Sequence, residues 1–196
     1  MKTRDYGQTW RVLHPVRMPR ARTGEFAFAA SGTCLVAKPH NNFWFVTGGV
    51  DTPRIFRTHN GGHTWNVRPT PLRGGPSAGI YSVDFRTIDR GVMVGGDYTE
   101  ETNGKKASAF LAVGERAWRL SGQPVRGYRS GVAYIPRTSH TVVAVGPSGT
   151  DVSRDGGRTW SQFSHIAFDG IQCSKRGGCW ASGPDGRVAK LLRAGS

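Results

Sequence analysis

An eight-residue sequence, referred to below as the octapeptide, occurs three times in the chain, at residues 3–10, 58–65 and 153–160. Each copy has Ser or Thr at its first position, Asp or Asn at the third, Gly at the fifth, Thr at the seventh and Trp at the eighth. Repeats with a period of tens of residues are typical of propellers and solenoids, which use one small structural unit several times. The octapeptide therefore predicts a repeat architecture.

The residue types of the octapeptide predict a tight turn between two strands. An Asp or Asn accepts hydrogen bonds from backbone N–H groups of the turn, and the following Gly adopts a positive φ without a Cβ clash. The Trp then begins the outgoing strand as a large apolar anchor. A catalytic or metal-binding role for the Asp is the alternative, and the Asn of the second copy argues against it. The structural residues of the three copies are Asp5, Gly7 and Trp10; Asn60, Gly62 and Trp65; and Asp155, Gly157 and Trp160.

The octapeptide resembles the Asp-box, or BNR, repeat of sialidase-like β-propellers. The chain as a whole resembles bacterial BNR-repeat proteins similar to photosystem II stability and assembly factors, and the resemblance covers nearly all of its length. Besides the octapeptides, it rests on the runs at Gly79–Phe85, Gly91–Tyr98, Gly127–Ser130 and Val145–Gly149. The resemblance implies an all-β propeller of four-stranded antiparallel blades. It says little about activity, because one fold supports many functions.

The spacing of the Trp residues and of the strand-like segments divides the chain into blades. Trp10, Trp65, Trp118 and Trp160 lie 55, 53 and 42 residues apart, and we expect all four to be mostly buried at equivalent blade edges. Strand patterns separated by turn residues are typical of such blades. The predicted units are a partial blade at 1–13, blades at about 26–71, 80–120 and 128–163, and an incomplete blade at 168–193.

Two interpretations of the chain ends follow from this division. Thr9–Leu13 could supply the missing fourth strand after Leu192 and close a four-bladed ring. Alternatively, the chain is the C-terminal part of a six- or seven-bladed ring, which the resemblance favours. Blade edges without neighbours would then promote self-association. The polar residues Met1–Asp5 predict no signal peptide, whereas we expect a longer parent protein to be exported to the periplasm or the exterior.

The chain has a large excess of positive charge, with 27 Lys and Arg against 13 Asp and Glu and a net charge of +14. Such a charge favours anionic partners. The Arg residues are scattered and no nucleic-acid-binding motif occurs, so we expect a protein or an acidic small ligand as partner and no specific nucleic acid. A solvated Arg-rich surface is the alternative. No apolar run of the length that spans a membrane occurs, so no membrane span is predicted.

Cys173 and Cys179 flank a five-residue turn and can face each other across a hairpin. Opposite residues of an antiparallel pair lie within disulfide range, so we predict a disulfide, which would agree with export of the parent protein. Two reduced thiols or half a metal site are the alternatives. No second Cys/His pair lies nearby, so we expect no metal and no cofactor. Cys34 is expected to be a buried thiol.

In a propeller the first strand of each blade lines a central channel, and Tyr81 and Arg129 lie on such predicted strands. Asp97 and Tyr98, at a strand end and in a loop, could project beside Arg129. These four are the candidate binding residues. Arg129 is the most informative, because a lone cation in a small, apolar strand needs an anion or a carboxylate partner. It either binds an acidic ligand at the channel mouth or pairs with an acidic neighbour and braces the ring.

A glycoside hydrolase of the sialidase-like class, or an inactive remnant of one, is the alternative function. The resemblance implies that such an enzyme needs three Arg around a carboxylate, a Tyr nucleophile activated by a Glu, and an acidic Asp. The chain has four Glu in total and lacks the Phe/Tyr-Arg-Ile-Pro signature, so this site is hard to assemble. We therefore expect no catalytic residues and a non-catalytic binding or assembly scaffold.

Overall fold

The computed structural model describes residues 1–12, 17–29, 32–174 and 177–192, which form four antiparallel sheets. The first sheet contains β1 (Leu35–Lys38), β2 (Asn42–Val46), β3 (Arg54–Thr58) and β4 (Asn66–Pro69). The second contains β5 (Ala78–Thr87), β6 (Arg90–Asp97), β7 (Ser108–Leu111) and β8 (Arg119–Leu120). The third contains β9 (Gly131–Tyr134), β10 (Val142–Gly146), β11 (Gly149–Ser153) and β12 (Ser161–Ser164). The fourth contains β13 (Gly170–Cys173), β14 (Cys179–Gly183) and β15 (Arg187–Lys190), with a 3-10 turn at Pro184–Gly186 before β15.

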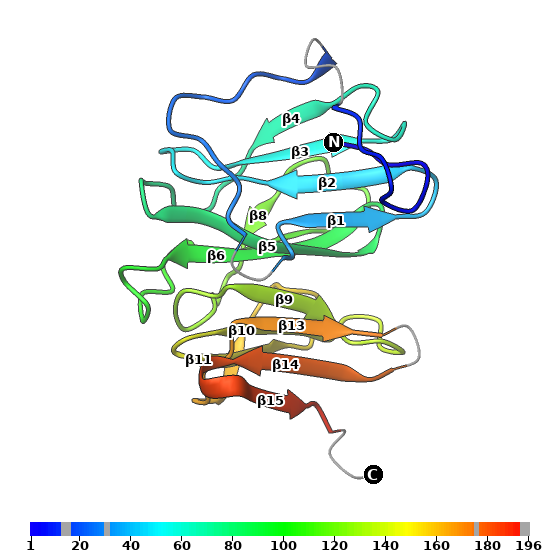
Figure 1. Cartoon of the computed structure of the whole chain (residues 1–196). Coiled ribbons are helices and arrows are strands. Elements are labelled where there is room, and N and C mark those ends of the chain that lie inside the picture. Colours follow the sequence, from blue (N-terminus) through cyan, green and yellow to red (C-terminus); the bar gives the residue numbers. More distant parts are fainter. Residues whose placement is uncertain (13–16, 30–31, 175–176, 193–196) are drawn as a thin grey trace.

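Within each sheet, consecutive strands pair in chain order, as expected for blades. The first strands of successive sheets contact each other, β1 with β5, β5 with β9 and β9 with β13, and they follow one another through the middle of the molecule (Figure 1). We call these four the inner strands. The all-β fold of antiparallel blades that the sequence predicts is confirmed. Two ends of predicted units, Leu13 and Arg193, lie outside the described residues.

The hydrophobic core lies between successive sheets rather than within one of them. Strand β6 shows why: Met93 points toward the first sheet, whereas Val92 and Val94 point toward the third. Successive side chains of a strand point to opposite faces, so a strand between two neighbours is apolar at every position. This explains the continuous apolar run in β6.

The octapeptide turns have the predicted hydrogen bonds. In the third copy, Asp155 Oδ1 accepts from the backbone N–H of Thr159 at 3.0 Å and from the hydroxyl of Ser153 at 2.7 Å. The Ser153 hydroxyl also accepts from the N–H of Gly157 at 2.8 Å. Gly157 has φ of 91°, a conformation that favours glycine. Asn60 makes the same contacts in the second copy, since its Oδ1 accepts from the N–H of Thr64 at 2.9 Å.

The expectation that all four Trp residues are mostly buried is wrong for Trp10. Trp160 is 2% exposed and packs between the second and third sheets, whereas Trp10 is 58% exposed. Trp65 and Trp118 are half-buried, against Phe45 and Phe85 respectively. Trp10 is exposed because its octapeptide has no blade of its own within the described chain to pack against.

The N-terminal residues lie against the first sheet, at the opposite end of the molecule from β15 (Figure 1). Lys2 pairs with Arg11 through two backbone hydrogen bonds, and Lys2 Nζ donates to Gly61 O at 3.4 Å. Glu25 accepts two hydrogen bonds from Arg54 of β3, which fix the following segment to the same sheet. The described residues therefore do not match the interpretation in which Thr9–Leu13 completes the fourth blade, and that blade has three strands within the described residues.

Candidate functional site

The predicted channel mouth is filled by side chains of the protein itself. Tyr81 at the start of β5 is buried, and its hydroxyl donates to Ser77 O at 2.9 Å. Phe28, from the segment before β1, stacks on Tyr81 with ring centroids 3.8 Å apart, and Tyr128 meets Tyr81 edge-on. Burial raises the pKa of the Tyr81 phenol above its usual value, so this hydroxyl stays protonated.

The backbone around Phe28 is shaped to accept its ring. A Cβ at Gly48 would lie 2.3 Å from Phe28 Cε2, and one at Gly79 would lie 3.0 Å from the same atom. Both positions therefore need glycine for the backbone to approach the ring closely. Phe28 thus closes this end of the channel, which leaves little room for a ligand beside Tyr81.

Asp97, the last residue of β6, and Tyr98, the first residue of the loop after it, lie at the same end of the inner strands. Asp97 is buried and accepts hydrogen bonds from the backbone N–H and the hydroxyl of Thr99. Arg73 Nη2 lies 3.3 Å from Asp97 and 2.6 Å from Glu100. Burial would raise the pKa of Asp97, but these hydrogen bonds and Arg73 outweigh it and lower the pKa. Of the four predicted site residues, Tyr98 alone is exposed, at 52%.

Arg129 is fully buried and paired with Asp151 of β11. Its Nε and Nη2 both lie 2.7 Å from Asp151 Oδ2, and the two side chains are 0% exposed. Its Nη1 donates to Tyr128 O at 2.9 Å and to the Ser148 hydroxyl at 2.8 Å. Burial lowers the pKa of the guanidinium and the Asp151 carboxylate opposes this shift, so the guanidinium stays charged. This geometry matches the second interpretation of Arg129, that of a brace within the ring.

The opposite end of the inner strands opens into a groove of about 670 Å³, lined by residues of β1, β5, β9 and β13. Polar side chains of β5 hold its walls together. Ser82 accepts from the backbone N–H of Val132, and Asp84 Oδ2 accepts from the N–H of Tyr134 at 2.8 Å. Asp84 Oδ1 accepts from Lys38 Nζ of β1 at 3.2 Å. Asp84 thus joins three sheets around the groove.

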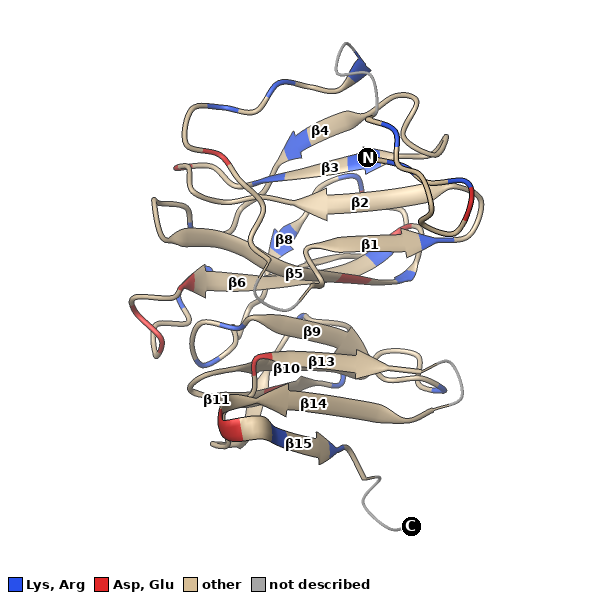
Figure 2. Ribbon diagram, viewed as in Figure 1, with Lys and Arg blue, Asp and Glu red and all other residues tan. Residues whose placement is uncertain are grey.

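Three basic residues line this open end: Lys38 of β1, Arg86 of β5 and Arg137 after β9. Lys38 is paired with Asp84, but Arg86 and Arg137 are exposed and have no carboxylate partner within the described ranges. Figure 2 shows the basic end of β1 on the right. The open end thus carries three basic side chains beside the Asp84 carboxylate.

Sequence analysis did not select these three residues, although a signal was present. Lys38, Arg86 and Arg137 each lie at or just after the end of the first strand of a predicted blade. Equivalent positions in three repeats converge around the axis of a propeller, so the repetition of a basic residue there was informative.

The predicted disulfide is present and lies beside the groove. Cys173 of β13 and Cys179 of β14 occupy paired positions of the hairpin and are bonded to each other. Cys173 lines the groove, so the disulfide stiffens the wall formed by β13. Cys34 is a free thiol that is half-buried rather than buried, and burial raises its pKa.

Within the described part of the chain, no group of three or more His, Cys, Asp or Glu side chains is placed to hold a metal ion. None of the helical segments there has the length and apolar character needed to cross a bilayer.

Neither a protein-family model nor a curated protein matches the chain. Among solved structures, one described as YCF48 bound to D1 peptide is similar, with a TM-score of 0.55 and 16% sequence identity. The similarity covers 88% of this chain and 56% of that structure's chain, so this chain spans little more than half of that length. At this identity the comparison bears on the fold alone, and together with the four sheets it confirms the β-propeller architecture.

Proposed function

We propose that this chain is a non-catalytic scaffold that binds an acidic, extended protein segment in the groove between the inner strands. The observation that carries the proposal is the pair of exposed, unpaired guanidinium groups of Arg86 and Arg137 at the open end of the groove. A guanidinium binds a carboxylate through two parallel hydrogen bonds, so each Arg can hold one acidic side chain.

The size and charge of the groove support this ligand class. A volume of about 670 Å³ lies in the range of sites that bury a ligand of several residues or a small molecule. The net charge of +14 adds a long-range attraction for acidic partners. The fold also supports the proposal, because the similar solved structure is that of a protein bound to a peptide.

The test compares a fluorescently labelled peptide rich in Glu with the same peptide carrying Gln in place of Glu. We expect the acidic peptide to bind, the Gln peptide to bind at least about tenfold more weakly, and the affinity to fall as salt is raised. Arg86→Gln and Arg137→Gln should each weaken binding several-fold. Arg154→Gln removes an exposed charge outside the groove and serves as the matched control.

Two results would overturn the proposal. One is equal binding of the acidic and Gln peptides, and the other is an equal loss of affinity in Arg154→Gln and the groove variants. All three side chains are exposed, so we expect each variant to fold normally. Circular dichroism and thermal unfolding of each variant check this and separate a loss of binding from a loss of fold.

A further inference from the structure

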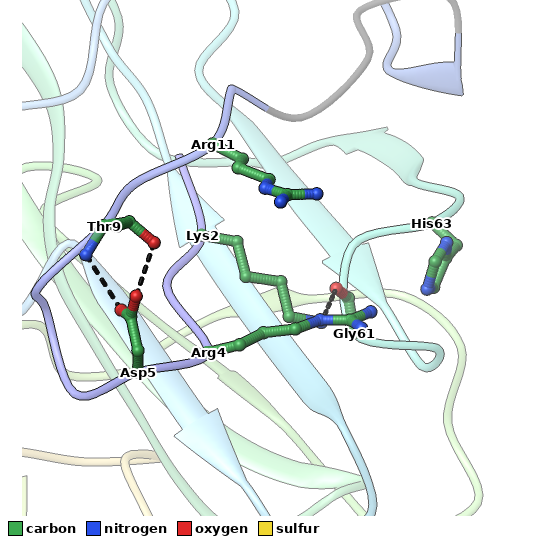
Figure 3. A pocket seen from close by; sticks show the side chains of 7 residues that line it. All are labelled: Lys2, Arg4, Asp5, Thr9, Arg11, Gly61 and His63. Atoms are coloured by element: carbon green, nitrogen blue, oxygen red, sulfur yellow. Dashed lines mark hydrogen bonds between the residues drawn. The ribbon is translucent and has the colours of Figure 1, made fainter.

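A second basic pocket, of about 450 Å³, lies between the first and second octapeptide turns (Figure 3). It is separate from the groove, because it is formed by the N-terminal residues and the loop between β3 and β4. Its lining residues are Lys2, Arg4, Asp5, Thr9, Arg11, Gly61 and His63.

The backbone fixes two of the cations directly opposite each other. Lys2 N–H donates to Arg11 O at 2.8 Å, and Arg11 N–H donates to Lys2 O at 2.9 Å. Residues paired in this way project their side chains to the same face of the ribbon, where like charges destabilise each other. Figure 3 shows Lys2 and Arg4 extending toward the turn that contains Gly61, with His63 beyond it.

The single carboxylate in the pocket is already engaged by its own turn. Asp5 Oδ1 accepts from the Thr3 hydroxyl at 2.7 Å and from the Thr9 N–H at 2.9 Å, and Oδ2 accepts from the Thr9 hydroxyl at 2.5 Å. The Thr9 hydrogen bonds lower the pKa of Asp5 to about 2, so it keeps its charge within the turn. Lys2, Arg4 and Arg11 therefore bring three permanent positive charges to the pocket, whereas the Asp5 carboxylate is held by hydrogen bonds within its turn.

Neither of the other octapeptides has a cation at both of the positions that correspond to Lys2 and Arg11. In the second copy the equivalent paired residues are Arg57 and Asn66. The residues that correspond to Lys2 and Arg11 are Val152 and Ser161 in the third copy, and they occupy the same paired positions. Arg154 corresponds to Arg4, but no cation pair lies beside it. The cation pair at the first copy therefore needs an explanation other than the formation of the turn.

We propose that the pocket formed by Lys2, Arg4, Arg11 and His63 binds a phosphate group. A phosphate presents several acceptor oxygens and two negative charges, which suit two guanidinium forks and an ammonium group. Its binding removes the repulsion between Lys2 and Arg11. Two sources share this chemistry, a free inorganic phosphate and a phosphorylated side chain of a partner protein.

The test is a calorimetric titration of the whole chain with inorganic phosphate and, in parallel, with phosphoserine. We expect saturable binding that chloride at matched ionic strength does not produce. Arg11→Gln should weaken it about tenfold or more, because it removes charge-assisted hydrogen bonds, and Arg154→Gln should leave it unchanged. Tighter binding of phosphoserine assigns the site to a phosphorylated partner, and tighter binding of inorganic phosphate assigns it to a free anion.

Absence of saturable binding by both probes would overturn the proposal. So would an equal loss in Arg11→Gln and Arg154→Gln, which would indicate a general effect of net charge. Thermal unfolding of Arg11→Gln controls for its fold, and Arg4→Gln provides a second variant that leaves the Lys2–Arg11 backbone pairing untouched. Arg86→Gln, which tests the groove, should bind phosphate normally, so the two proposals can fail independently.

Discussion

The first and third octapeptides form the same turn, yet their Trp side chains have opposite environments. In both copies the Asp accepts hydrogen bonds from the backbone and the hydroxyl of the Thr four residues later. Trp160 is enclosed between two sheets and its Nε1 donates to the Ser121 hydroxyl, whereas Trp10 is 58% exposed and donates to Gly7 O of its own turn.

This difference shows that the octapeptide determines the turn but not the burial of its Trp. The turn depends on hydrogen bonds within eight residues, so every copy forms it wherever it lies. Burial of the Trp depends on apolar side chains from neighbouring sheets, such as Val94 and Phe110 around Trp160. The octapeptide therefore specifies a turn, and the surrounding blades specify a core.

The largest expected effect comes from truncating the two Trp residues. Trp160→Ala should lower the free energy of unfolding by about 3–5 kcal/mol, because it leaves a cavity between two sheets. Trp10→Ala should change it by less than about 0.5 kcal/mol, as for an exposed side chain. Urea unfolding of both variants measures the difference. Similar losses in the two would mean that the copies are equivalent and that the comparison is wrong.

The second prediction contrasts Arg129, inside the third blade, with Arg4 in the first octapeptide. Arg129→Ala should destabilise the protein by about 3 kcal/mol, because it leaves the Asp151 carboxylate buried without a counter-charge. Arg4 is exposed, so Arg4→Ala should have almost no effect on the free energy of unfolding. A double variant, Arg129→Met with Asp151→Leu, should be less destabilised than Arg129→Ala. Wild-type stability in Arg129→Ala would restore the interpretation that Arg129 binds a ligand.

A smaller effect is expected for the Asp residues of the two turns. Asp155→Ala should lower the free energy of unfolding by about 1 kcal/mol, since two hydrogen bonds from Thr159 are lost in the turn that joins β11 to β12 of a packed blade. Asp5→Ala should leave global unfolding unchanged and increase only the amide exchange rate of Thr9. Equal shifts of the urea midpoint in both variants would show that the turn itself, and not its surroundings, sets the effect.

The smallest effect concerns the attachment of the N-terminal segment through Glu25 and Arg54. Burial would raise the pKa of Glu25, but hydrogen bonds from Arg54 and Thr47 outweigh it and lower the pKa to about 2. A lowered folded-state pKa means that this stabilisation is complete above the usual value of 4.5 and is lost as pH falls toward 2. The stability difference between wild type and Glu25→Gln should therefore shrink across this window. A difference independent of pH would contradict the assignment.

Strands β6, β9, β10 and β11 could be predicted from sequence because both of their faces are buried and turn residues mark their ends. The Cys173–Cys179 disulfide was predictable because a short hairpin places the two residues opposite each other. The partner of Arg129 was harder to identify. Asp151 lies on another strand, and only the three-dimensional register brings the two together.

The closure of the channel mouth by Phe28 could not be predicted from sequence patterns. Phe28 belongs to an irregular segment without periodicity, and its position depends on small residues at Gly48 and Gly79 from two different sheets. The open, basic end of the groove was predictable in principle, because basic residues recur at the ends of the inner strands. Its accessibility follows from the groove that the described residues leave at that end.

The central claim is that the ligand binds at the basic end of the inner strands and not at the Tyr81 end. The most direct test is an NMR titration of isotope-labelled protein with the acidic peptide. The account predicts that the largest shifts fall on the backbone and side-chain nitrogens of Lys38, Arg86 and Arg137. Shifts concentrated around Tyr98 and Glu100, with the signals of Arg86 and Arg137 unchanged, would contradict it.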